Sequence, residues 1–144
     1  MTPAELDLIR ADGALVDAEV FASAFYGTLF ELAPETRRLF GDDLVAQRGK
    51  LVDELGFLVD AATAAGESGD LSPFVDRARD LGRRHVGYGV RGPDYVPVGE
   101  ALLAALAEVV DGWDDTHVQA WRKLYRLIAD VMREGADRDL FSAN

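Results

Sequence analysis

The sequence predicts a single all-α domain, and three observations lead to this prediction. Apolar residues recur at the three- and four-residue spacing of helices along most of the chain, and no alternation typical of strands persists. The 144 residues match the size of one ordinary domain, without an internal repeat or a low-complexity linker. Hydrophobic residues make up 49% and charged residues 28%, which is close to the globular average and argues against wholesale disorder. We therefore expect one domain over 1–144, with a helical core at about 2–135 and a frayed tail at 136–144.

The first two expected helices begin and end at recognisable signals. A helix over 3–16 has Thr2 as its N-cap and Pro3 at its first position. A second helix over 18–33 ends at Pro34, which also opens a short helical turn that runs to residue 40.

The next two expected helices are separated by a loop of small and polar residues at 64–70. The third helix covers about 43–65, and its apolar face consists of Leu44, Leu51, Leu55, Leu58 and Ala62. The fourth runs to about 86, with Ser72 as its predicted N-cap and Pro73 opening it.

Two further helices complete the expected fold. One covers about 95–111 after the turn VGYGVRGP, and the last covers about 115–135, capped by Asp114 or Asp115. The helix lengths are unequal and two connectors are short. This distinguishes the pattern from an up-down bundle of four similar helices.

Composition excludes several classes of function. Acidic residues number 26 against 15 basic ones, so the net charge of −11 disfavours nucleic acid and anionic membrane surfaces as partners. Cysteine is absent, which excludes disulfides, thiol catalysis and thiolate metal sites and accords with a reducing compartment. No apolar run approaches 18 residues and the N-terminus is acidic rather than signal-like, so we expect a cytoplasmic protein.

The two histidines narrow the possible cofactors. A site with several imidazoles is excluded, and the glycine-rich stretch 87–95 matches no nucleotide-binding pattern. His85 ends an apolar stripe formed by Phe74, Ala78 and Leu81 and therefore faces the interior. Two interpretations fit such a residue. It is either a core imidazole satisfied by a carbonyl or the protein ligand of a haem iron, whose other four ligands the porphyrin supplies.

Four other polar residues each have an ordinary structural interpretation, and two of them also have a functional one. Gln47 borders an apolar face, where it either reaches solvent or lines a pocket. Lys50 is either solvated or brings its ammonium to a carboxylate at a pocket rim. Tyr26 is most often a packing residue with its hydroxyl bonded to a carbonyl. His117 begins the last helix, and we expect it to face solvent without a functional role.

Three separated motifs resemble one known family in their order and spacing. They are FYGTLFELAPETRRLF at 25–40, AQRGKLVDEL at 46–55 and LGRRHVGYGVRGPDYVPVGEALLAAL at 81–106. Together they resemble a globin, in particular bacterial single-domain haemoglobins and the globin part of flavohaemoglobins. The resemblance implies about seven helices packed around a haem pocket, with haem b as the cofactor, and it extends from about Thr2 to Gly135.

The resemblance also implies roles for individual residues. His85 matches the proximal ligand of the haem iron, and Phe40 matches the phenylalanine that wedges against the porphyrin. On the distal side, Tyr26 and Gln47 match the residues that contact bound oxygen, and Leu51 matches the apolar residue that packs over the iron.

Further matches concern the rim and the proximal side. Lys50 is a candidate partner of a haem propionate, and Val98 is a candidate haem contact. Tyr95 matches the proximal tyrosine of flavohaemoglobins, which belongs to a network with a glutamate on the last helix. Here Ala136 occupies the place of that glutamate, and Glu134 lies about 200° away around the helix. We therefore expect weaker donation of electron density to the iron.

The function implied by the resemblance is reversible binding of oxygen, and of NO and CO, at an iron whose sixth position is open or weakly occupied. Oxygen storage, delivery or scavenging would follow. The alternative is a nitric oxide dioxygenase or weak peroxidase that depends on a separate flavin reductase, because 144 residues leave no room for flavin and nicotinamide domains. A haem-free or sensor globin is a third possibility, against which His85, Phe40 and Gln47 argue. The oligomeric state is expected to be a monomer or a homodimer.

Overall fold

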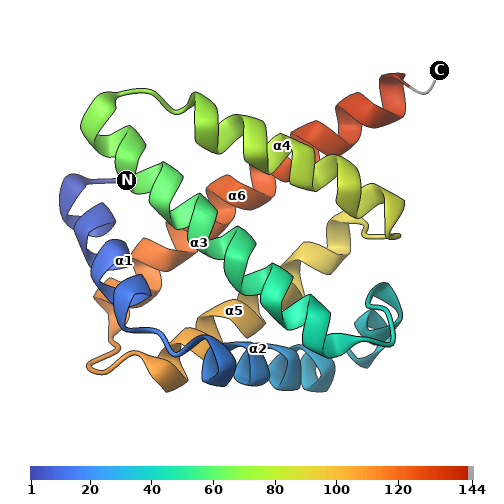
Figure 1. The fold of residues 1–144 in the computed structure, drawn as a ribbon, viewed down its shortest axis with the longest axis horizontal. Coiled ribbons are helices and arrows are strands. Elements are labelled where there is room, and N and C mark those ends of the chain that lie inside the picture. Colours follow the sequence, from blue (N-terminus) through green and yellow to red (C-terminus); the bar gives the residue numbers. More distant parts are fainter. Residues whose placement is uncertain (143–144) are drawn as a thin grey trace.

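The computed structural model describes residues 1–142 of the chain, with side chains up to residue 136. Six α-helices and two short 3₁₀ turns make up this part, and it contains no strand (Figure 1). The prediction of an all-α fold is confirmed. The elements are α1 (Pro3–Leu15), α2 (Ala18–Leu32), η1 (Pro34–Leu39), α3 (Leu44–Ser68), α4 (Ser72–Gly87), η2 (Gly92–Asp94), α5 (Tyr95–Val109) and α6 (Asp115–Ser142).

Side-chain caps explain why the helices begin where they do. Thr2 accepts a hydrogen bond from the Glu5 amide, and the Glu5 carboxylate accepts one in return from the Thr2 amide. Asp114 caps α6 by accepting from the amides of residues 116 and 117. The predicted cap of α4 is wrong. Ser72 is the first helical residue, and the Asp70 carboxylate accepts from its amide at 3.0 Å.

Two helices are longer than the sequence pattern predicts. α3 continues through 65–68, which we expected to be loop, and ends at Gly69 with φ +79°. α6 continues past 135 to Ser142. Both places contain alanine and no proline, so a helix that is already formed can continue through them, even across Gly66 in the first. The last two residues of the expected tail, 143–144, lie outside the described residues.

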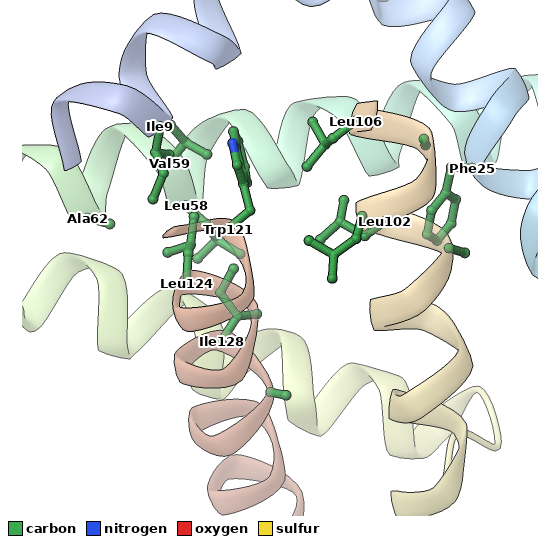
Figure 2. Close-up of a cluster of buried hydrophobic side chains, with 14 of the residues drawn as sticks. Ile9, Phe25, Leu58, Val59, Ala62, Leu102, Leu106, Trp121, Leu124 and Ile128 are labelled. Carbon is green, nitrogen blue, oxygen red and sulfur yellow. The ribbon is translucent and has the colours of Figure 1, made fainter. Parts of the chain in front are cut away.

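The core lies where α5 and α6 pack against the helices of the first half of the chain. Trp121 is only 2% exposed, and Figure 2 shows it with Leu124 of α6 near Leu58 of α3, while Leu102 of α5 points towards Phe25 of α2. Burial of each such side chain contributes about 1.5–3 kcal/mol, so this cluster is the main source of stability.

α4 and α6 cross at a very short distance, which two glycines make possible. A Cβ added to Gly82 would lie 1.9 Å from the backbone oxygen of Met132, and one added to Gly135 would lie 2.3 Å from that of Arg79. Both distances are far inside van der Waals contact. This crossing therefore fixes the position of α4, and with it the position of His85, relative to α6.

Gly82→Ala is expected to destabilise the protein by about 1–3 kcal/mol, because a methyl group at this position would push two helix backbones apart. Gly87→Ala on the same helix is the matched control. No atom lies within 4 Å of its added Cβ, and it should change the free energy of unfolding by less than about 0.5 kcal/mol. Urea unfolding of the two variants measures the difference. Equal stability of the two variants would contradict the close crossing.

A buried polar contact links the first and last helices. Asp12 is 4% exposed, and its Oδ2 accepts hydrogen bonds from Nε1 of Trp121 and Nδ1 of His117, both at 2.8 Å. The expectation that His117 faces solvent is therefore wrong, since its side chain is 14% exposed and its ring stacks on Trp113. A buried carboxylate needs donors, and a histidine and an indole one turn apart on α6 supply them.

α3 and α4 diverge from a short connection at residues 69–71, so that they separate towards the opposite end of the molecule (Figure 1). Gln47 lies near the diverging end of α3, and His85 lies near the diverging end of α4. Over residues 1–142, no helix combines the length and apolar character that crossing a bilayer requires.

Candidate functional site

His85 is held in one tautomer by its own helix. Its Nδ1 lies 2.7 Å from the Leu81 carbonyl oxygen, which can only accept, so Nδ1 carries the proton. The lone pair of Nε2 is left without a partner among the described residues. Burial lowers the pKa of His85 below its usual value, and the Leu81 bond only partly offsets this. The ring is therefore neutral near pH 7 and suited to binding a metal through Nε2.

Tyr26 lies in a cluster of aromatic rings formed by the second half of α2 and by Phe40. Its ring meets Phe40 edge to face at 5.2 Å, meets Phe25 in the same way at 5.2 Å, and lies 5.8 Å from Phe30. Its hydroxyl has no hydrogen-bond partner among the described residues, so the expected bond to a carbonyl is wrong. Burial raises the pKa of Tyr26 to about 12, which keeps the hydroxyl protonated and able to donate. The structure thus brings Tyr26 and Phe40 together.

The distal candidates on α3 differ in their exposure. Gln47 and Leu51 are half-buried, and Leu51 packs against the core. The Gln47 side-chain amide has no partner within the described part of the chain. Lys50 is exposed and makes no ion pair with a described residue. Gln47 and Leu51 thus place an amide donor and an apolar side chain on the same face of α3. Glu54 lies further along this face.

Tyr95 is buried at the first position of α5. Its carbonyl accepts a hydrogen bond from the Tyr125 hydroxyl, and the Arg133 guanidinium lies over its ring at 4.8 Å. Burial raises the pKa of Tyr95. Val98, one turn later on α5, is half-buried and packs against the core.

The last helix presents a cation rather than a carboxylate to Tyr95. Ala136 is half-buried, and the Glu134 carboxylate pairs with Arg79 of α4 at 2.7 Å. Arg133 therefore occupies the face of α6 that meets Tyr95, a contact that we did not predict.

Two further residues near the site were missed by the sequence analysis. Arg48, beside Gln47, has a buried Nε without a hydrogen-bond partner, and its positive charge acts on Tyr26. Glu54 is half-buried between α3 and α4. A signal was available for both. Arg48 shares its helical stripe with Val52 and Leu55, and Glu54 shares that of Leu51.

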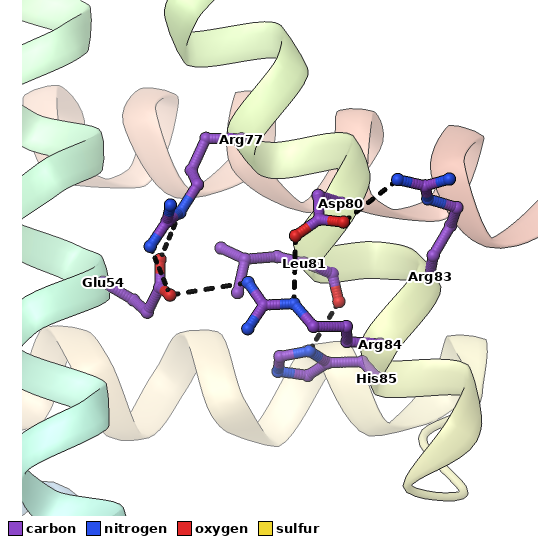
Figure 3. A network of polar contacts seen from close by, with 7 residues as sticks. All are labelled: Glu54, Arg77, Asp80, Leu81, Arg83, Arg84 and His85. Carbon is purple, nitrogen blue, oxygen red and sulfur yellow. Dashed lines mark hydrogen bonds and ion pairs between the residues drawn. The ribbon is translucent and has the colours of Figure 1, made fainter.

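Glu54 links the two helices that carry Gln47 and His85. Its carboxylate accepts two hydrogen bonds from Arg77, at 2.8 and 2.9 Å, and a longer one from Arg84 at 3.4 Å (Figure 3). The guanidiniums of Arg77 and Arg84, in that order, lower the pKa of Glu54, although burial opposes them.

These features define a class of site. A neutral imidazole with a bare Nε2 lies on one helix, unpartnered hydroxyl and amide donors lie on two others, and the surrounding side chains are apolar and half-buried. An all-α fold with this set of groups has the chemistry needed to hold a metal in a flat apolar macrocycle. The donor set thus fits a haem.

Comparisons with known proteins identify the family. Residues 23–132 match the family model described as Globin, and the chain belongs to the globin family. It is 30% identical over 147 residues to a flavohemoprotein of Bordetella parapertussis, covering 99% of this chain and 35% of that protein. It is 28% identical to a flavohemoprotein of Rhizobium meliloti, again covering 35% of the relative. The chain thus spans about a third of the length of these relatives.

A solved structure confirms the globin fold. The ferric myoglobin of Aplysia limacina is similar with a TM-score of 0.71 and 23% identity, covering 94% of this chain and 98% of the myoglobin. The predicted fold class, a globin fold formed by a succession of unequal helices, is therefore correct.

Proposed function

We propose that this protein binds haem b through His85 and uses it to bind oxygen reversibly. The observation that carries this proposal is the state of His85, whose Nδ1 bond to Leu81 leaves a neutral Nε2 without a partner. Membership of the globin family supports the same assignment. Bound haem would supply an iron that takes up oxygen, NO or CO at one open or weakly occupied position.

The other residues of the proposed haem site would hold the macrocycle and would determine which gas binds most tightly. Phe40, Leu51 and Val98 would pack against its apolar faces. Tyr26 and Gln47 would donate hydrogen bonds to oxygen, which becomes partly negative in such a site. Each bond of this kind contributes about 1.5–3 kcal/mol, and CO, being less polar, gains less. Oxygen storage, delivery or scavenging would follow from tight but reversible binding.

The surroundings of Lys50 and Tyr95 favour gas binding over catalysis. Lys50 is exposed and free to reach a haem propionate. Among the residues whose side chains the structure describes, the last helix meets Tyr95 with Arg133, and Ala136 stands where flavohaemoglobins have a carboxylate, so these two residues would not increase the basicity of His85. The absence of cysteine accords with a cytoplasmic protein.

A nitric oxide dioxygenase, or a weak peroxidase, is the second candidate. It is favoured by the similarity to flavohemoproteins, of which this chain matches about a third. Repeated cycles would require electrons from a separate flavin reductase, which would be the partner of this protein.

Visible spectra of the purified protein test the main proposal. We expect a Soret band in the oxidised form, a shift on reduction and a further shift with CO, together with reversible changes as oxygen is added and removed. Protein that takes up no haem from solution would refute the proposal.

The isolated chain is expected to convert one equivalent of nitric oxide to nitrate when loaded with oxygen and to stop with ferric haem. It should not oxidise NADH, because the sequence contains no nucleotide-binding pattern. Stopped-flow spectra and nitrate analysis measure the single turnover. Continued NADH consumption without an added reductase would contradict this expectation.

A further inference from the structure

The contact between Glu54 and α4 differs from an ordinary surface ion pair. Arg77 binds the carboxylate with both Nε and an Nη, a two-point geometry that fixes the relative orientation of the partners. The Glu54 side chain is only 22% exposed, whereas isolated surface pairs contribute little. The Arg77 guanidinium also stacks over the Phe57 ring of α3 at 4.8 Å. The Arg77 side chain of α4 thus contacts two residues of α3, Glu54 and Phe57.

This contact lies on the face of α3 that carries the distal candidates. Gln47, Leu51 and Glu54 follow one another at spacings of four and three residues, so they share one side of the helix. On α4, Arg84 immediately precedes His85, and Figure 3 shows the His85 ring below the Arg84 side chain. The carboxylate therefore lies between the helix that carries Gln47 and the one that carries the iron ligand.

The charges around His85 are balanced through Glu54. Arg84 pairs with Asp80 at 3.1 Å and with Glu54 at 3.4 Å. Arg84 and Glu54 act on the His85 imidazole in opposite directions, so their effects partly cancel. Without Glu54, Arg77 would lose its ion-pair partner, and Arg84 would be paired with Asp80 alone.

We propose that Glu54 is a positioning residue of the haem site, which holds α4 against α3 and offsets the charge of Arg84 beside His85. The inference rests on the proposed haem site and extends it. It implies that Glu54 affects both how long haem is retained and how easily it is reduced. Removal of a negative charge near the iron favours the ferrous state, so the midpoint potential should rise.

Haem-loaded wild-type protein, Glu54→Gln and Arg84→Met form the main series of the experiment. Haem transfer to excess apomyoglobin gives the dissociation rate, and spectroelectrochemistry gives the midpoint potential. Both variants are expected to lose haem about two- to five-fold faster, which corresponds to the strength of a partly exposed ion pair. Their potentials should move in opposite directions, up for Glu54→Gln and down for Arg84→Met. A purely structural role would not produce opposite signs.

Glu134→Gln is the matched control. It breaks the 2.7 Å ion pair between Glu134 of α6 and Arg79 of α4. This pair also involves an arginine of α4, but it joins α4 to α6 rather than to α3. Its potential should shift less than that of Glu54→Gln, and its haem loss should stay near the wild-type rate. If Glu54→Gln does not fold, Arg84→Met carries the charge test through the fall in its midpoint potential. Glu54→Asp keeps the charge but shortens the side chain, so it carries the positioning test through faster haem loss at an unchanged potential.

The outcomes separate this inference from the proposed function. If wild-type protein shows a normal Soret band while both variants keep its potential and its rate of haem loss, only the role of Glu54 is refuted. Potentials that move in the same direction would refute it as well. If the wild-type protein takes up no haem, the proposed function is refuted, and the role of Glu54 is refuted with it.

Discussion

Replacement of His85 with alanine is expected to yield protein that purifies largely without haem. The Nε2 atom of His85 is the imidazole nitrogen left bare at the predicted pocket, whereas His117 is bound to Asp12 between α1 and α6. Without His85, haem would keep its apolar contacts and its proposed propionate partner Lys50, but it would have no bond between the protein and its iron. Haem content per chain and the reduced-state spectrum measure the loss.

Two additions make the His85 experiment specific. His117→Gln is the control, because glutamine can still donate to Asp12, and this variant should keep a full complement of haem. Free imidazole added to His85→Ala should restore part of the Soret band by replacing the missing ring. Normal stoichiometry and an unchanged spectrum in His85→Ala would show that another residue binds the iron.

Tyr26→Phe is expected to raise the rate of oxygen release by about 10- to 150-fold, which corresponds to the loss of a hydrogen bond of about 1.5–3 kcal/mol. The rate of CO release should change much less, since CO is the less polar ligand. Stability should stay close to that of the wild type, because the Tyr26 hydroxyl has no partner within the described residues. Stopped-flow measurements of release, together with urea unfolding, test all three parts.

The same hydroxyl predicts a pH profile. Burial raises the pKa of Tyr26 to about 12, so it remains a donor between pH 7 and 10 and the oxygen release rate should be constant over that range. Tyr88→Phe is the control, since Tyr88 is 60% exposed, and it should leave both gas release rates unchanged. Unchanged release in both Tyr26→Phe and Gln47→Leu would show that neither side chain contacts the ligand.

Much of the fold was predictable because its signals are local. The cap of Thr2 and the cap by Asp114 involve residues three or fewer positions apart. Thr2 was predicted correctly, and Asp114 was one of the two predicted caps of the last helix. Errors occurred where local signals compete. Residues 65–68 have a loop-like composition, yet they extend α3. Ser72 has the residue type of a cap, yet it is the first helical residue of α4 and its amide donates to Asp70. Small differences in propensity are easily overridden when a packed helix can be continued.

The candidate site was predicted in part, and its omissions have a common cause. His85, Tyr26 and Phe40 were recognisable from apolar stripes and from motifs that resemble globins. Glu54 was passed over because a charged residue on a helix is usually solvated, and its partner Arg77 lies 23 residues further along the chain. No local pattern indicates which carboxylate will meet which guanidinium.

The sequence by itself determined the all-α class, the starts of most helices and the inward direction of His85, because periodicity and capping act within a few residues. Only the tertiary structure decided which helices meet and at what distance. It brings His117 to Asp12 across 105 residues and α4 to α6 through Gly82, and it places Glu54 beside the helix of His85. These contacts depend on how separate helices pack around one core. That packing is settled by the shapes and charges of surfaces distant in the sequence, which no short segment contains.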